Sequence, residues 1–237
     1  KSYRLTMLPL QNITQVVTPV MHPIFSDFQD DKMKLATSYE RIIRFLAFIG
    51  LPLSVLLFFT AEEVTLIIFG NQWLPSVAVF RILALSVGIQ ILLYSSDSIF
   101  QAAGDTRSLF ICGLFSSTLN VAGIVLGIFY FGTLTAIAGC IVTTFTINFV
   151  QCYWQMYRVT FRQSAWPFIR QLISPLVISI LIALALIPMQ YALEGMNIFV
   201  TIIAKGIVSF IIFGIYIQMT HEYDIIGKVR SLRIKNL

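Results

Sequence analysis

Residues 171–192 read QLISPLVISILIALALIPMQYA, an apolar run that contains no charged side chain. A helix needs about 20 mostly apolar residues to cross the hydrocarbon core of a bilayer. This run is long enough, and it predicts a transmembrane helix. The chain contains six further segments of the same character. We expect these helices at about 4–25, 43–69, 77–101, 108–131, 134–157 and 198–219.

The composition of the whole chain agrees with this prediction. Of its 237 residues, 57% are hydrophobic and only 11% are charged, and the mean hydropathy is +0.85. A soluble domain carries roughly 25% charged residues, so this chain has too little charge to cover a surface in water. The composition excludes a disordered chain, a coiled coil, a secreted disulfide scaffold and an ordinary cytosolic enzyme. We therefore predict an all-α integral membrane protein with about seven transmembrane helices.

The distribution of basic residues predicts how these helices are oriented. The chain has 16 Lys and Arg residues, and most of them follow the first, third, fifth and seventh segments. Short loops rich in Lys and Arg lie on the cytoplasmic side of a membrane. We therefore expect the chain to enter from outside and to end in the cytoplasm. Because it starts at Lys1 inside an apolar segment, we also expect that the first part of a longer protein is missing.

Polar side chains form a stripe along each of three predicted helices. At 100° per residue, polar residues spaced three, four or seven apart share one face of a helix. A polar face turned toward lipid is penalised, so we expect the three stripes to converge on one hydrated cavity. The alternative is that they pair with each other across a packed bundle. The stripes consist of Arg4, Gln11, Gln15, Thr18 and His22 on the first helix, of Ser86, Gln90, Tyr94, Asp97 and Gln101 on the third, and of Cys140, Thr144, Asn148, Gln151 and Gln155 on the fifth.

The stripes supply the candidate functional residues. Arg4 either binds an anionic head group or extends its charge to the interface. Asp97 either binds a cation or a proton, or it caps the cytoplasmic end of its helix or forms a salt bridge with Arg107. His22 is a candidate proton carrier because its ordinary pKa lies near physiological pH, and the alternative is a simple hydrogen bond. Arg81 points away from its stripe, which favours either extension of its charge to the interface or a partner elsewhere. The candidate substrate-binding residues are Arg4, Gln11, Gln15, Gln90, Asn148 and Gln151.

Motifs for catalysis or metal binding are absent from the sequence. Cys112, Cys140 and Cys152 lack the spacing of a zinc site or a disulfide framework, and no HExxH, GxSxG or P-loop pattern occurs. The pair Glu62–Glu63 lies next to a predicted outer loop without a partner base. We expect no metal, no cofactor, no enzymatic activity and no nucleic-acid partner, in spite of the formal net charge of +5.

Glycine and proline indicate packing and interruptions. Gly123 and Gly127 are spaced for a close approach of two helices. The run Gly50–Leu51–Pro52 predicts an interruption of the second helix, because proline removes a backbone hydrogen bond. We expect a second interruption of this helix at Glu62–Glu63.

Several short runs together resemble a known family. They are YRLTMLPLQN at 3–12, PIFS at 23–26, DFQDD at 27–31, FGNQWLP at 69–75, FRILA at 80–84 and QAAGDTR at 101–107. Over about residues 1–160 the chain resembles Wzx-type polysaccharide flippases of the colanic-acid and teichuronic-acid exporter type. These belong to the multidrug/oligosaccharidyl-lipid/polysaccharide exporter superfamily.

The resemblance implies a fold and a function. Such exporters have 12–14 helices in two lobes around a central cavity, and they flip undecaprenyl-pyrophosphate-linked oligosaccharide to the outer leaflet of the bacterial inner membrane. By that pattern, residues 1–160 are the core of the second lobe with five helices, 161–226 form two peripheral helices, and 227–237 are a basic cytoplasmic tail. The implied partners are the lipid-linked oligosaccharide, membrane lipid and a missing N-terminal lobe. Cationic residues line the cavity in this family, and Arg4 is the best positional match, with Arg81 at a recurring position.

Other functions remain open at this stage. Cation-coupled multidrug efflux on the same fold requires a carboxylate inside the membrane, and Asp97 is the candidate. A membrane polysaccharide polymerase or ligase requires a large outer loop, which the predicted loops do not provide. A retinal pigment would use Lys205 on the last segment, but the third helix lacks an acid at matching depth.

Overall fold

The computed structural model describes residues 32–220. The first predicted helix and the basic tail lie outside the described residues. The same is true of the candidate residues Arg4, Gln11, Gln15 and His22.

The described part of the chain consists of helices and contains no strand. Five helices are long and apolar enough to cross a membrane, or up to six if a bent pair counts as one span. The predicted all-α membrane fold is confirmed, and the number of seven spans is approximate. The elements are α2 (Lys32–Phe59), α3 (Ala61–Phe69), the 3-10 helix η1 (Asn71–Ser76), α4 (Val77–Ala84), α5 (Val87–Ala102), α6 (Thr106–Leu126) with the π-turn η2 (Gly127–Phe131), α7 (Leu134–Gln155) with the π-turn η3 (Met156–Thr160), α8 (Trp166–Ala192) and α9 (Ile198–Thr220).

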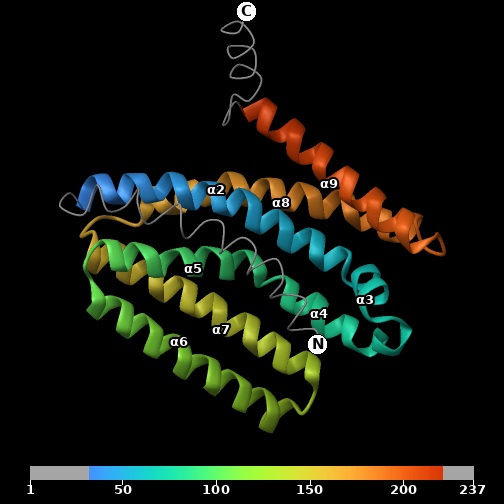
Figure 1. Cartoon of the computed structure of the whole chain (residues 1–237), viewed down its shortest axis with the longest axis horizontal. Helices are drawn as coiled ribbons and strands as arrows, with labels where there is room; N and C mark the ends of the chain where they lie inside the picture. The colour runs from blue at the N-terminus through green and yellow to red at the C-terminus, as the bar shows by residue number, and fades with distance from the viewer. Residues whose placement is uncertain (1–31, 221–237) are drawn as a thin grey trace, which may run out of the picture.

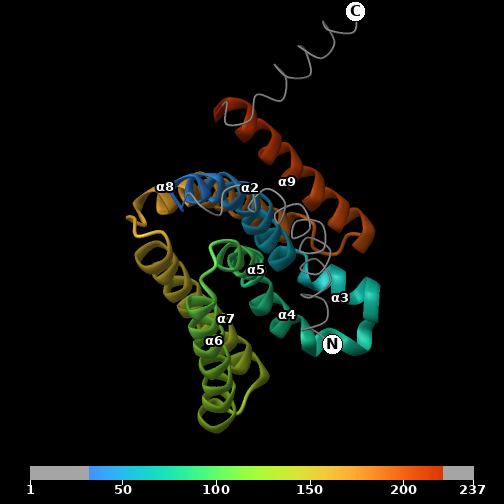
Figure 2. The same ribbon diagram turned by 60° about the vertical axis from the view of Figure 1, so that its left-hand side comes forward.

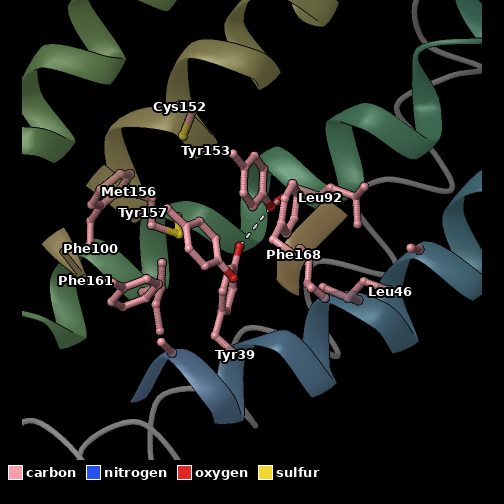
Figure 3. Packing of buried hydrophobic residues seen from close by; sticks show 14 of the residues in the cluster. Tyr39, Leu46, Leu92, Phe100, Cys152, Tyr153, Met156, Tyr157, Phe161 and Phe168 are labelled. Atoms are coloured by element: carbon pink, nitrogen blue, oxygen red, sulfur yellow. Dashed lines mark hydrogen bonds between the residues drawn. The ribbon is translucent and has the colours of Figure 1, made fainter. Parts of the chain in front are cut away.

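Helix α2 is the centre of the arrangement. It lies beside α8 on one side and α5 on the other, while α6 and α7 pack together farther out and α9 crosses the α2–α8 pair (Figure 1, Figure 2). Buried side chains of α2, α5, α7 and α8 form the main core. The rings of Tyr39, Tyr153, Tyr157 and Phe168 gather at its centre (Figure 3).

The predicted interruption of the second helix at Gly50–Leu51–Pro52 is wrong. Helix α2 continues through Pro52 and breaks only at Thr60, before Glu62–Glu63. Gly50 serves a different purpose, because α2 crosses α5 at this point. A Cβ atom added at Gly88 of α5 would meet the carbonyl oxygen of Gly50 at 2.8 Å. The small residues are therefore required by the close crossing and do not mark a helix end.

One serine connects the two helices at the crossing. The Ser54 hydroxyl donates to the Gly50 carbonyl oxygen at 3.1 Å and accepts the backbone N–H of Gly88 at 2.6 Å. The Gly88 N–H lies near the start of α5, where helical N–H groups have no partner within the helix. Ser54 thus satisfies a backbone donor and fixes α2 against α5.

The third predicted helix is divided into two. Helices α4 and α5 are separated at Leu85–Ser86, and the span from Asn71 to Ala102 is bent by 50°. The Ser86 hydroxyl donates to the Leu83 carbonyl oxygen at 2.7 Å. A serine hydroxyl that bonds to the preceding turn often bends a helix, which is a sufficient local cause of the break.

Large aromatic side chains are exposed after α6 and on α9, as expected for helices that contact lipid. Phe129 after α6 is 82% exposed, and Phe210 of α9 is 78% exposed.

Between α6 and α7, the backbones approach closely. A Cβ atom on Gly127 would lie 3.0 Å from the Cα atom of Ile137, and one on Gly123 would collide with Thr144. The predicted close packing at these two glycines is confirmed.

Candidate functional site

A polar cavity with a volume of about 250 Å³ lies between α5, α6 and α7. The structure thus brings members of the third-helix and fifth-helix stripes to one place, together with serines of α6. The polar and sulfur-containing residues of its wall are Gln90, Tyr94, Ser96 and Asp97 of α5, Cys112, Ser116 and Ser117 of α6, and Asn148 and Cys152 of α7.

Gln90 enters this cavity from the start of α5. Its side-chain amide donates from Nε2 to the Ser86 hydroxyl at 2.7 Å, so the bend between α4 and α5 orients it. Only 3% of the residue is exposed, yet its Oε1 atom is buried without a hydrogen-bond partner. The sequence prediction placed Gln90 on a polar face, and the structure gives that face an unused acceptor.

Helix α7 contributes two more acceptors of the same kind. Asn148 is buried and its Oδ1 atom has no hydrogen-bond partner. One turn along the helix, Gln151 donates from Nε2 to Oε1 of Gln155 at 2.8 Å, while its own Oε1 is buried and unpartnered. We call the cavity and the amides of Gln90, Asn148 and Gln151 the amide cavity.

Unpaired buried acceptors are unusual in a folded protein. Roughly 90% or more of buried polar groups have a hydrogen-bond partner, and leaving one unpaired costs about 1–3 kcal/mol. Carbonyl oxygens of Gln90, Asn148 and Gln151 are all in this condition on two adjacent helices. Such acceptors suit hydroxyl donors, water or a cation.

Asp97 lies at the exposed side of the amide cavity. Like Tyr94, it lines the cavity and is exposed. The predicted salt bridge with Arg107 is wrong, because within residues 32–220 the ion pairs involve neither Asp97 nor Arg107. Asp97 is therefore a carboxylate on the cavity wall without a cationic protein partner among the described residues.

A network of buried hydroxyl groups supports the cavity from behind. The Tyr39 hydroxyl lies 2.9 Å from both the Ser95 and the Tyr153 hydroxyl oxygens, and the Tyr153 hydroxyl donates to the Leu92 carbonyl oxygen at 2.9 Å. Figure 3 shows Tyr39 and Tyr153 directed at each other from α2 and α7. Next to Ser95, Ser96 contacts the thiol of Cys152 at 3.3 Å. This network joins α2, α5 and α7 behind the cavity wall.

A second polar cluster lies where α2, α3, α8 and α9 meet. The Lys205 ammonium group is 1% exposed. It donates to the Phe59 carbonyl oxygen at 2.8 Å and to Gln190 Oε1 at 3.3 Å, and it forms an ion pair with the Glu63 carboxylate. An ammonium group has three donors, so each has an acceptor. We call Lys205, Glu63, Gln190 and the Phe59 carbonyl group the lysine cluster.

The neighbouring charges are paired as well. Arg81 lies 3.8 Å from the Glu62 carboxylate and over the ring of Phe58 at 5.9 Å. Of the two alternatives for Arg81, the structure shows a partner away from its stripe. The Glu62–Glu63 pair thus has two cationic partners, Arg81 and Lys205.

Asp105 fixes the turn between α5 and α6. Its carboxylate accepts the backbone N–H of Ser108 at 3.0 Å and the Thr160 hydroxyl at 2.7 Å. Partial burial alone would raise the pKa of Asp105, but these hydrogen bonds and the charge of Lys32 lower it below its ordinary value. The turn is thereby tied to the end of the α7–η3 span.

The chain has recognisable relatives. A family model described as polysaccharide biosynthesis protein matches residues 1–78. Teichuronic acid biosynthesis protein TuaB of Bacillus subtilis (strain 168) is 24% identical over 103 residues, which are 44% of this chain and 21% of that protein. Lipopolysaccharide biosynthesis protein WzxC of Escherichia coli (strain K12) is 21% identical over 179 residues, which are 76% of this chain and 36% of that protein. The resemblance to Wzx-type polysaccharide flippases is confirmed.

The fold of this Wzx-like chain has a solved counterpart. Lipid II flippase MurJ, in an inward closed conformation, superposes with a TM-score of 0.72 at 13% sequence identity. The match covers 93% of this chain and 46% of MurJ. At this identity the likeness concerns the fold alone, and it agrees with the predicted architecture of a flippase lobe.

The Wzx-like family match and the amide cavity lie in different parts of the chain. The match ends at residue 78, whereas Gln90, Asn148 and Gln151 follow it. The sequence prediction found the amides because they form stripes, but it missed Glu63 as the partner of Lys205. Their opposite charges near the same end of two predicted spans would have been the signal.

Proposed function

We propose that this chain is part of a transporter that moves lipid-linked oligosaccharide across the bacterial inner membrane for the synthesis of surface polysaccharide. The observation that carries the proposal is the set of unpaired amide oxygens of Gln90, Asn148 and Gln151 beside a polar cavity in a flippase-like fold. The chain then acts as a transporter and not as an enzyme.

The chemistry of the cavity suits a sugar head group. A glycan presents many hydroxyl donors, and it cannot cross a hydrocarbon core of about 30 Å unaided. Amide oxygens accept hydrogen bonds from such hydroxyls. Because the amides are uncharged, they bind the glycan weakly enough for it to be released. The proposal gives substrate contacts to Gln90, Asn148 and Gln151, together with Gln11 and Gln15 of the first predicted helix.

The anionic part of the substrate requires a cation. An arginine forms two parallel hydrogen bonds with a phosphate group, and Arg4 keeps this role in the proposal. In the described part of the chain, Arg81 is already paired with Glu62. Arg81 is therefore a less suitable phosphate ligand than its family position implies.

Movement of the substrate follows the alternating-access scheme. Two lobes would rock about the shared cavity and expose it to each side in turn. This chain supplies one lobe, with residues 1–160 as its core and 161–226 as peripheral helices, and the partner is an N-terminal lobe of the same transporter. The chain would begin outside the cell and end in the cytoplasm.

A second candidate function, cation-coupled drug efflux, rests on Asp97. This carboxylate lines the amide cavity without an ion-pair partner among the described residues. In either transporter, Asp97 is the proposed coupling residue, together with His22. Tight binding of cationic dyes that is lost in Asp97→Asn would favour efflux over polysaccharide export.

Transport is tested in a strain whose surface polysaccharide depends on this protein. Gln90→Leu combined with Asn148→Leu should reduce surface polysaccharide at least tenfold and cause lipid-linked oligosaccharide to accumulate. Gln218→Leu, an amide exposed on α9, is the matched control and should have no effect. Normal polysaccharide in the double variant at wild-type protein levels would refute the role of the amide cavity. Arg4→Ala tests the phosphate contact by the same measurement.

Hydration of the cavity is tested with a membrane-impermeant thiol reagent. In a background without native cysteines, Ser116→Cys should react because Ser116 lines the amide cavity. Ser209→Cys is the control, because Ser209 is buried in α9 and donates to the Lys205 carbonyl oxygen at 2.8 Å. Equal reactivity at the two positions would contradict a hydrated cavity.

A further inference from the structure

A basic cleft lies on the other side of α2 from the amide cavity. It has a volume of about 640 Å³ and is formed by α2, α8 and α9. None of the residues that line it also lines the amide cavity. We define this basic cleft by Arg44 of α2, by Arg170, Gln171 and Ser174 of α8, and by Tyr216 of α9.

The cleft concentrates positive charge and hydrogen-bond donors. Arg44 and Arg170 face it from two different helices, and no acidic residue is among the described residues that line it. The hydroxyl oxygens of Ser174 and Tyr216 lie 2.8 Å apart and connect α8 to α9 at its wall. Guanidinium groups match the geometry of phosphate oxygens, so the polar half of the cleft suits a phosphate ester.

The other half of the cleft is apolar and open to lipid. Ile173 and Val177 line it on α8 and are 50% and 40% exposed. Trp166 at the start of α8 also lines it and is 68% exposed, which is typical of a side chain at the membrane interface. A ligand of this cleft therefore carries both an anionic head and a hydrocarbon chain.

The cleft lies at the end of the bundle where positive charge accumulates. Arg158 and Arg162, just before α8, are exposed, and this end is the one that the basic residues predict to be cytoplasmic. Basic pockets between transmembrane helices on the cytoplasmic side bind anionic lipid head groups.

We infer that the basic cleft binds the phosphate head group of an anionic membrane phospholipid from the cytoplasmic leaflet. Arg44 and Arg170 hold the phosphate, the Ser174–Tyr216 pair and Gln171 contact the head group, and one acyl chain lies along Ile173 and Val177. The bound lipid connects α2 to the α8–α9 pair. This inference does not depend on the transported substrate.

The test is native mass spectrometry of the full-length protein released from lipid nanodiscs. With phosphatidylglycerol, we expect one lipid molecule to remain bound per chain. Each exposed or half-exposed basic residue near a membrane contributes about fivefold to anionic lipid binding, so Arg44→Gln with Arg170→Gln should weaken retention about 30-fold. Arg44→Lys with Arg170→Lys keeps the charge and should retain part of the binding. Unfolding temperature and elution volume verify that the variants are folded.

Matched controls decide between this lipid and other sources of phosphate. Arg41→Gln, one turn from Arg44 but exposed and outside the cleft, should bind as the wild type does. Phosphatidylcholine with the same acyl chains should not be retained. Equal retention of phosphatidylcholine, or unchanged retention in the folded double variant, would overturn the inference. Displacement of the lipid by millimolar inorganic phosphate, or stronger binding of undecaprenyl phosphate through the same arginines, would also overturn it.

Discussion

The amide cavity and the lysine cluster are both polar and both lie within apolar helices, but they differ in one respect. In the lysine cluster, each donor of the Lys205 ammonium group has an acceptor. In the amide cavity, the carbonyl oxygens of Gln90, Asn148 and Gln151 are buried without partners. In the lysine cluster the cation is fully satisfied and one oxygen of its ion-pair partner, Glu63 Oε2, is left without a hydrogen bond. In the amide cavity three neutral acceptors are left without a partner among the described residues, which gives room for a ligand.

This difference separates polar groups that stabilise the packing from polar groups that we propose to bind substrate. A buried ion pair holds its helices together, and breaking it leaves a charge in an apolar environment. An unsaturated cluster lowers stability, and proteins keep such groups mainly where function requires them. We therefore expect substitutions in the lysine cluster to affect folding and substitutions in the amide cavity to affect transport.

The largest effect is expected for Lys205→Met. The change leaves the Glu63 carboxylate buried without its cation, which should lower the free energy of unfolding by about 3–5 kcal/mol. This loss of stability is measured by unfolding the protein in mixed micelles and monitoring its circular dichroism. Arg81→Met is the matched control, because its pair with Glu62 is one-third to one-half exposed, and it should cost less than about 1 kcal/mol.

A second substitution tests whether the instability of Lys205→Met comes from the unpaired Glu63 carboxylate. Adding Glu63→Leu to Lys205→Met removes the orphaned charge and should restore most of the lost stability. A double variant as unstable as the single one would show that the ion pair is not what holds α9 to α3.

A smaller loss of stability is expected for Gly88→Ala. The new methyl group would meet the Gly50 carbonyl oxygen at 2.8 Å, and because this neighbour is backbone the helices must move apart. We expect a cost of about 1–3 kcal/mol, with a shifted Gln90 and reduced transport. Gly139→Ala, where a Cβ atom meets nothing within 4 Å, is the control. Unchanged stability in Gly88→Ala would mean that the crossing is not tightly packed.

Gln90→Leu should change stability still less. The substitution removes an unpaired buried acceptor as well as one hydrogen bond to Ser86, so the two effects offset each other to within about 1 kcal/mol. The same micelle titration measures stability, and surface polysaccharide measures transport. A large destabilisation with normal transport would reverse the assignment of the amide cavity.

The smallest effect is expected for Asp105→Asn. The lowered pKa of Asp105 means that its carboxylate stabilises the fold fully above the unfolded value near 3.9. That contribution is lost as the pH falls through the lower folded value. The variant should be less stable by about 0.5 kcal/mol at pH 7, and the difference should vanish in acid once the carboxyl group of the folded protein is protonated. A difference that persists in acid would exclude the charge as its cause.

The fold was predictable because apolar length is a property of the sequence alone. Long apolar runs identified α6, α7, α8 and α9 to within a few residues. The start of α2 at Lys32 was not predictable in this way, because its first turns are polar. Pro52 was misleading because its local preference is outweighed by the packing of α2 on α5.

The candidate site was predictable only where it repeats along a helix. Gln90 and Asn148 belong to stripes, and the structure places both at the amide cavity. The lysine cluster and the basic cleft join single residues of separate helices, such as Lys205 with Glu63 and Arg44 with Arg170. The spacing of residues along one helix cannot predict these two clusters, because they form only when the helices pack together.

The Ser54 hydroxyl has a mechanical consequence. It bonds at the same time to Gly50 of its own helix and to the backbone of Gly88 across the crossing. Sliding α2 along α5 by even one residue would break the second bond and drive two backbones into each other. A single oxygen atom thus sets the register of two spans, and any piston-like stroke of α5 must carry α2 with it.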